Sequence, residues 1–301
     1  MDDGPEEDPL AALLESWALQ MEVAETSRNT ILLYVRGVNA YREWCAATSA
    51  EATFGKTHVE RFIVACKDDY GRGVSTRKAY LKGIRRFVHW AVEEGELAKD
   101  EVSSIPSPSM GKTLPPSISL ETHAAILATC DAKTLIGKRD AALLMMLLTS
   151  GCRASELIGL QLADVTVRTR RALVHGKGRQ DRLVAYTSET ALALDRYIRA
   201  RRLHKAASSL TALWLSQRGT PLTYWGLDGM VERRAQMAGL DSVHAHQWRH
   251  LWARTFLRDS GNRDALKLLG GWKSDEMVEH YTQVDAAERA LEVYDRVYGS
   301  R

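Results

Sequence analysis

Two side chains in the segment "HAHQWRH" (244–250) have types and spacing that suit chemistry on a phosphodiester. His246 and Arg249 stand three residues apart, so on a helix they lie one above the other. Arginine offers a planar fork of donors for phosphate oxygens, and histidine can hold or move a proton near neutral pH. The segment therefore predicts one wall of a phosphate site.

The same segment also suggests a metal site, because His250 follows His246 by four residues. A zinc-protease helix of the HExxH type needs Glu where this chain has Gln247, and no third ligand of the usual kind stands nearby. The cysteines are scattered without a CxxC pair, at Cys45, Cys66, Cys130 and Cys152. We therefore expect no metal site, no cofactor and no disulfide.

Three further segments carry candidate side chains, each with an ordinary structural alternative. "TSGCRASELIGLQLADV" has Arg153 with Glu156 three residues later, which by itself is typical of a surface ion pair. "HGKGRQDR" puts Lys177 between glycines at a predicted hairpin tip, where it is either solvated or delivered to a phosphate as a point charge and proton donor. "GGWKSDEMVEHY" places Tyr281 nine residues after Trp272.

The net charge of the chain is only +3, but its basic residues gather in three stretches. No acid occurs from Tyr70 to Val92, six Lys or Arg and one acid occur from Arg168 to Arg182, and five cations follow between Arg196 and Lys205. A basic surface facing a polyanion is the functional interpretation, and solvated helix faces are the alternative. In the first stretch the candidate DNA-binding residues are Arg77, Lys78, Lys82, Arg85 and Arg86, and Arg179 joins them from the second.

The elements that must position these residues predict a mainly α protein with a small antiparallel β-sheet. We expect an acidic, disordered tail over 1–9, a four-helix domain over 10–101 and a Pro-rich linker over 102–118. Ser27, Ser75 and Ser119 are the expected helix caps. The second domain, 119–301, should hold strands near 165–167, 172–175 and 182–186, then helices near 188–206, 222–238, 245–258, 262–269, 274–281 and 285–297.

Taken together and in order, the segments around Arg153, Lys177, "HQWRH", "LLGGW" and Tyr281 resemble the tyrosine recombinase (phage integrase) family, including Xer-like site-specific recombinases. The resemblance covers roughly 119–285. It also implies that the helical first domain is the family's core-type DNA-binding domain. Arg77, Lys78, Lys82, Arg85 and Arg86 lie on its fourth helix, which is our candidate for a groove contact.

The resemblance implies a role for each matching residue. Arg153 and Arg249 match the two catalytic arginines, Lys177 the hairpin lysine, His246 the first residue of the HxxR pair, and Tyr281 the nucleophile. Three more matches complete the set: Glu156 and His250 as supporting residues, and Trp272 at a position that is His in many members. Indole donates a hydrogen bond but transfers no proton in this pH range, so Trp272 should orient and pack.

By the same resemblance, Tyr281 attacks a DNA phosphate and forms a 3′-phosphotyrosine with a free 5′-hydroxyl, without metal or ATP. Arg153, Arg249 and His246 bind the non-bridging oxygens, and Lys177 protonates the leaving oxygen. His246 is a further candidate for accepting the Tyr281 proton. Tyr294 and Tyr298 are rival nucleophiles that we assign to packing.

The implied partners are double-stranded DNA at specific recombination sites and three further copies of the chain. The tetramer would act through a Holliday junction, with the C-terminal helix 285–297 docked on a neighbouring copy. Docking of that helix on its own domain is the alternative. Excision factors or accessory DNA-bending factors are further expected partners. Because only an acidic segment of about ten residues precedes the first helix, we expect no arm-binding domain.

Two other functions fit the same residues: a type IB topoisomerase-like strand transferase, and a catalytically inactive DNA-binding relative. The N-terminus has no secretory signal, and no apolar run approaches the roughly 20 residues of a membrane span. We therefore expect a cytoplasmic protein that associates with DNA.

Overall fold

The computed structural model describes residues 9–48, 52–109, 117–176, 180–272 and 274–284, together with 291, 294–295 and 297–299. The chain divides into two compact units, Met1–Thr113 and Leu114–Arg301, and the division falls inside the segment predicted as a linker. The predicted acidic tail lies almost entirely outside the described residues, as do Lys177, Arg179 and much of the predicted C-terminal helix.

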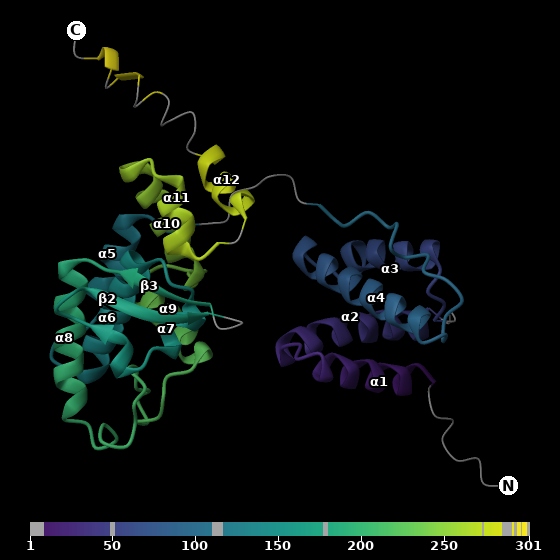
Figure 1. Cartoon of the computed structure of the whole chain (residues 1–301), viewed down its shortest axis with the longest axis horizontal. Helices are drawn as coiled ribbons and strands as arrows, with labels where there is room; N and C mark the ends of the chain where they lie inside the picture. Colours follow the sequence, from purple (N-terminus) through teal and green to yellow (C-terminus); the bar gives the residue numbers. More distant parts are fainter. Residues whose placement is uncertain are drawn as a thin grey trace. The chain divides into compact units, whose positions relative to one another are not determined.

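The first unit is built from four helices around an apolar core (Figure 1). They are α1 (Pro9–Val23), α2 (Arg28–Ala47), α3 (Lys56–Asp68) and α4 (Val74–Glu93). Trp17 and Phe87 meet edge to face, and Tyr41 and Phe62 do the same deeper in the core. The prediction that Ser75 caps the fourth helix is wrong: the N-cap is Gly73, two residues earlier, because the chain is already helical from Val74 and Ser75 lies inside the first turn of α4.

Helices α2 and α4 pack against each other closely because each has a glycine at the contact. A Cβ atom on Gly83 would lie 2.6 Å from the carbonyl oxygen of Tyr34, and one on Gly37 would lie 2.9 Å from the Cα of Tyr80. Both neighbours are backbone atoms, which cannot move aside as a side chain can. This contact fixes how α4 is rotated, and with it the face that carries Lys78, Lys82 and Arg86.

The second unit surrounds the buried helix α6 (Leu135–Ser150), which packs against α8 (Ser188–Arg202) and α10 (His246–Ser260). The predicted cap Ser119 is confirmed, because its hydroxyl accepts a hydrogen bond from the backbone of Thr122. The remaining helices are α5 (Leu120–Ala128), α7 (Ala154–Gly159), the 3₁₀ helix η1 (Leu162–Asp164), α9 (Tyr224–Met237), α11 (Arg263–Gly270) and α12 (Asp275–Val284).

The expected small antiparallel sheet has the order β1-β2-β3, with β1 (Val165–Thr166), β2 (Arg171–Gly176) and β3 (Gln180–Ala185). Strands β2 and β3 form a hairpin in register from Arg171 opposite Ala185 to Gly176 opposite Gln180. The hairpin therefore leads directly to 177–179, where Lys177 and Arg179 lie.

Helices α10, α11 and α12 lie together at one end of the second unit (Figure 1). They share a small apolar cluster that includes Trp252, Leu257, Leu266, Trp272 and Tyr281. This cluster places the helix of Tyr281 beside the helix of His246 and Arg249. In the described part of the chain, no helix is both long and apolar enough to cross a membrane.

Candidate active site

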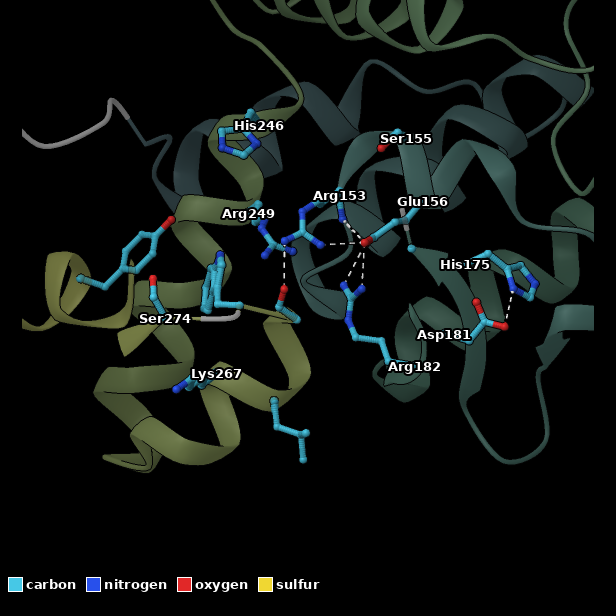
Figure 2. Close-up of a pocket in the computed structure, with 15 residues that line it drawn as sticks. Arg153, Ser155, Glu156, His175, Asp181, Arg182, His246, Arg249, Lys267 and Ser274 are labelled. Atoms are coloured by element: carbon cyan, nitrogen blue, oxygen red, sulfur yellow. Dashed lines mark hydrogen bonds and ion pairs between the residues drawn. The ribbon is translucent and has the colours of Figure 1, made fainter. Parts of the chain in front are cut away.

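A pocket of about 1020 Å³ opens on the second unit where α7, α10, α11 and α12 meet the hairpin (Figure 2). Six residues that the sequence singled out lie in its walls: Arg153, Glu156, His246, Arg249, Trp272 and Tyr281. Lys177 and Arg179 fall outside the described residues, but their neighbours Gly176 and Asp181 line the pocket. Tertiary structure thus gathers residues that are separated by up to 128 positions (281 minus 153) in the chain.

Arg153 is held by the start of α7. Gly151 ends α6 in the left-handed conformation, with φ of 65°, and turns the chain so that Arg153 becomes the N-cap of α7. The backbone N–H of Arg153 donates to Oε2 of Glu156 at 2.8 Å, and its Nη1 donates to Oε1 at 2.8 Å. Its Nη2 donates to the carbonyl oxygen of Gly271 at 3.0 Å. The guanidinium is therefore fixed while its remaining N–H groups face the pocket.

Glu156 lies between two arginines, as Figure 2 shows. Arg182 on β3 donates from Nη1 and Nη2 to the two carboxylate oxygens, at 2.8 Å each. Burial by itself would raise the pKa of Glu156, but the hydrogen bonds from Arg182 and Arg153 lower it to about 2. Glu156 is therefore an anion at any ordinary pH.

Sequence reasoning did not assign a role to Arg182. Strand alternation provides a signal that could have found it, because Arg182 and Val184 share the inward face of β3 while Asp181 and Leu183 are exposed. An arginine on the inward face of a strand needs a buried anion, and Glu156 is the partner.

Arg249 is a largely buried residue in the wall of the pocket. It donates from Nη1 to the carbonyl oxygen of Gly151 and from Nη2 to that of Gly270, the latter at 2.5 Å. Its guanidinium lies 4.6 Å from the ring centroid of Trp272. Burial and the nearby charge of Arg153 lower the pKa of Arg249 to about 10, so it remains a cation at neutral pH. The expected packing role of Trp272 agrees with this contact.

His246 begins α10 at the mouth of the pocket, above Arg249 in Figure 2. Partial burial lowers the pKa of His246, and the charges of Arg249 and Arg153 lower it further. Near pH 7 the imidazole is therefore neutral, with one nitrogen able to donate and the other able to accept. Its ring meets that of His250 edge to face, with centroids 4.6 Å apart.

Tyr281 is buried between Trp272 and His250. Its ring centroid lies 5.4 Å from that of Trp272, and its hydroxyl oxygen lies 2.5 Å from Nδ1 of His250. Burial raises the pKa of Tyr281 to about 12, although the charge of Arg249 acts in the opposite direction. The phenol is therefore protonated at neutral pH, and His250, assigned only a supporting role from the sequence, is hydrogen-bonded to its hydroxyl group.

Ion pairs lie on two sides of the pocket. Near the tip of the hairpin, His175 lies 3.1 Å from Asp181 and 3.3 Å from Asp164, and these carboxylates raise the pKa of His175. On the other side, Lys267 of α11 pairs with Asp275 of α12 at 2.6 Å. Among the described residues, no three His, Cys, Asp or Glu side chains gather closely enough to hold a metal ion.

The cations of α4 that were predicted to contact DNA differ in their surroundings. Lys78, Lys82 and Arg86 are exposed at four-residue intervals and therefore form one stripe along the helix. Arg77 and Arg85 are half-buried, and Arg85 donates to the Val102 carbonyl at 3.3 Å and to the Ser107 hydroxyl at 3.1 Å.

Known proteins resemble this chain in sequence and in fold. The family model described as "Phage integrase family" matches residues 118–288, which is more than half of the chain. The chain belongs to the phage integrase family. This integrase-family chain is 30% identical over 291 residues to tyrosine recombinase XerC of Haemophilus influenzae (strain PittEE), covering 96% of this chain and 97% of that protein. It is 28% identical over 292 residues to tyrosine recombinase XerD of Corynebacterium glutamicum, covering 91% and 94%.

Solved structures of recombinases share the fold of this integrase-family chain. XerH site-specific recombinase bound to palindromic difH substrate matches with a TM-score of 0.73 and 21% identity, over 92% of this chain and 84% of that one. A lambda integrase dimer bound to a COC′ core site matches with a TM-score of 0.70 and 14% identity, over 92% and 81%. The predicted fold class is confirmed, and the chain is an Xer-like site-specific tyrosine recombinase.

Proposed function

We propose that this recombinase cleaves and rejoins double-stranded DNA at specific sites through a 3′-phosphotyrosine at Tyr281. The observation that carries the proposal is the convergence of Arg153, Arg249, His246 and Tyr281 on one pocket. Two fixed guanidinium groups and a neutral imidazole match the oxygens of a phosphodiester, and the phenol supplies a nucleophile.

The two arginines and His246 stabilise the charge that gathers on the non-bridging oxygens in the transition state. Arg153 and Arg249 are already hydrogen-bonded to backbone carbonyls, so they need no reorganisation when the phosphate arrives. Preorganised donors of this kind are each worth on the order of 10²–10³ in rate. His246, at the mouth of the pocket, adds a hydrogen bond from its neutral ring.

In the cleavage step, the bond between the Tyr281 oxygen and phosphorus forms while the bond between phosphorus and the 5′ oxygen breaks. The phenol is protonated at neutral pH and needs a base, and Nδ1 of His250 at 2.5 Å is placed to accept that proton. Lys177, outside the described residues, is the proposed donor to the leaving 5′ oxygen. Attack by a 5′-hydroxyl then releases Tyr281 without metal or ATP.

Recombination follows when that 5′-hydroxyl comes from a partner duplex. We propose a tetramer on two DNA sites that passes through a Holliday junction, with the segment 285–297 docked on the neighbouring copy. The solved relatives bound to a difH substrate and to a COC′ core site support DNA as the partner. Excision or DNA-bending factors would select the direction of exchange.

A suicide substrate tests the nucleophile. With a nick near the cleavage site, the released fragment diffuses away and the covalent adduct accumulates. The wild-type chain should form a denaturation-resistant protein–DNA adduct, and Tyr281→Phe should form none, while Tyr298→Phe should behave as wild type because Tyr298 is assigned to packing. An adduct with Tyr281→Phe, or none with the wild type, would contradict the proposal.

Exchange between two duplexes separates a recombinase from a topoisomerase-like strand transferase. Two labelled duplexes that carry the recognition site should give junction intermediates and exchanged products. Relaxation of supercoiled DNA without exchange would favour the topoisomerase-like alternative. DNA binding without an adduct would favour the inactive relative.

A further inference from the structure

We propose that Arg182 is a positioning residue for the cleavage reaction, acting on the catalytic Arg153 through the carboxylate of Glu156. This inference rests on the proposed function, because it assigns Arg153 to the scissile phosphate. It concerns a residue of β3 to which the family resemblance assigned no role.

The burial of the two arginines separates their roles. The side chain of Arg153 is 42% exposed, whereas that of Arg182 is 14% exposed and that of Glu156 is 4% exposed. All three nitrogens of the Arg182 guanidinium donate to protein atoms, two to Glu156 and Nε to the Leu269 carbonyl at 3.0 Å. Arg182 therefore faces the protein, while Arg153 retains N–H groups for a substrate.

The C-terminal end of α11 connects Arg182 to both catalytic arginines. The carbonyl oxygens of three consecutive residues each accept a hydrogen bond from a different arginine: Leu269 from Arg182, Gly270 from Arg249 and Gly271 from Arg153. The last carbonyls of a helix lack intrahelical partners and carry partial negative charge, which suits guanidinium groups. A shift of Arg182 would therefore disturb the anchor that Arg153 and Arg249 share.

The position of Arg182 under the end of α11 also explains why residue 271 is a glycine. Gly271 ends α11 with φ of 62°, and a Cβ atom there would lie 3.0 Å from the guanidinium carbon of Arg182. The segment "LLGGW" thus leaves room for Arg182 beneath the turn that holds Arg153.

The charge of Glu156 makes the proposal measurable. Burial of Glu156 raises its pKa, and the hydrogen bonds from Arg182 and Arg153 hold the pKa down at about 2. Removing Arg182 leaves burial opposed by Arg153 alone, so the pKa of Glu156 should rise. A protonated Glu156 holds Arg153 less well, and cleavage should then weaken as the pH falls.

The test compares adduct formation on the suicide substrate for the wild type, Arg182→Gln, Glu156→Gln and the double variant. Misplacement of a catalytic group by about 1 Å costs on the order of 10²-fold, so Arg182→Gln should slow cleavage by about 10- to 100-fold. If Arg182 acts through Glu156, adding Arg182→Gln to Glu156→Gln should cost little more than Glu156→Gln alone.

A matched buried pair in the same unit provides the control. Arg234 is 13% exposed and donates from Nε and Nη2 to Asp140, which is 3% exposed, away from the pocket. Arg234→Gln should cost comparable stability but leave the pH profile of cleavage unchanged. Arg182→Gln should also lose cleavage rate as the pH falls. Arg182→Lys keeps the positive charge but not the paired donors of the guanidinium. Its cleavage should therefore be slower than that of the wild type, but most of the extra loss at low pH should disappear.

Three results would overturn the inference. The rate losses of the two single variants could add up in the double variant. The cleavage rate of Arg182→Gln could fall at low pH no more than that of the wild type, or the rate of Arg234→Gln could show the same extra fall at low pH. If the wild type forms no adduct, the proposed function fails instead. A pH titration of the Glu156 carboxyl carbon by ¹³C NMR then tests whether Arg182 acts on Glu156, without any need for catalysis. The signal of Glu156 is assigned by its absence in Glu156→Gln. A raised pKa in Arg182→Gln would support it, and an unchanged pKa would overturn it.

Discussion

The two histidines of "HAHQWRH" show how residues of one type take different roles through their surroundings. His246 stands at the mouth of the pocket, and the charges of Arg249 and Arg153 help keep its ring neutral. His250, one helical turn further, is buried against the hydroxyl of Tyr281. The first is suited to meet the phosphate and the second to receive the proton of the nucleophile.

A third histidine, His123 on α5, should make the second unit sensitive to acid. It is buried and accepts a hydrogen bond at Nδ1 from the indole of Trp248 at 2.9 Å, and burial lowers its pKa to about 4. The unfolded chain binds a proton near pH 6.5, whereas the folded chain does so only near pH 4. The contribution of neutral His123 to the free energy of unfolding is therefore fully present above about pH 6.5. It is lost as the pH falls, and the loss reaches about 2–3 kcal/mol at pH 4.

Urea unfolding between pH 7 and pH 4 measures this loss. His123→Gln should flatten the pH dependence, and the exposed His244→Gln, in the same unit, should leave it as in the wild type. An equal loss with and without His123 would show that other groups control the acid response.

At the scale of the element, glycines decide which helices approach closely and how the site is framed. Gly151 illustrates this in the second unit: a Cβ atom there would lie 2.6 Å from the ring of Trp252, and its carbonyl accepts a hydrogen bond from Arg249. The turn between α6 and α7 thus packs against the apolar cluster and also orients the guanidinium of Arg249.

The contact between α2 and α4 predicts a change in stability opposite to the one that helix propensity alone would give. Alanine is favoured over glycine inside a helix by about 1 kcal/mol, yet Gly83→Ala should destabilise the first unit by about 1–3 kcal/mol because its Cβ would meet backbone. Gly229→Ala on α9 is the control: the nearest atom is the end of the flexible Arg233 side chain at 3.3 Å, so this change should be stabilising. Thermal unfolding compares them, and stabilisation by Gly83→Ala would show that the helices can separate without cost.

At the scale of the whole molecule, charge distribution should govern affinity for DNA more than net charge does. Lys78, Lys82 and Arg86 form an exposed stripe on α4. Replacing all three with Gln should make the association constant for DNA less dependent on salt. The slope of its logarithm against the logarithm of the salt concentration should fall by up to about 0.9 for each phosphate that the protein no longer neutralises. Arg85→Gln on the same helix should change the slope less, since Arg85 already bonds Val102 and Ser107. Titrations of full-length protein at several salt concentrations would decide, and an unchanged slope in the triple variant would remove this stripe from the DNA interface.

The sequence by itself determined the helical content, the hairpin, the order of the motifs and the identity of six of the residues that meet in the pocket. These features depend on local periodicity and on residue types whose chemistry is intrinsic, as in the spacing of His246 and Arg249 on one helical turn. Sequence reasoning placed the cap of α4 two residues late, because Ser75 is a good cap by type while Gly73 and Val74 are weak signals.

Only the tertiary structure decided how those residues are held. The link from Arg182 through Glu156 to Arg153 joins β3 to α7, and the carbonyls that receive the three arginines belong to α11 and the glycine that ends it. The contact between His250 and Tyr281 joins residues 31 positions apart on different helices. Such contacts depend on where buried charges find partners, and that is set by the packing of distant elements rather than by spacing along the chain.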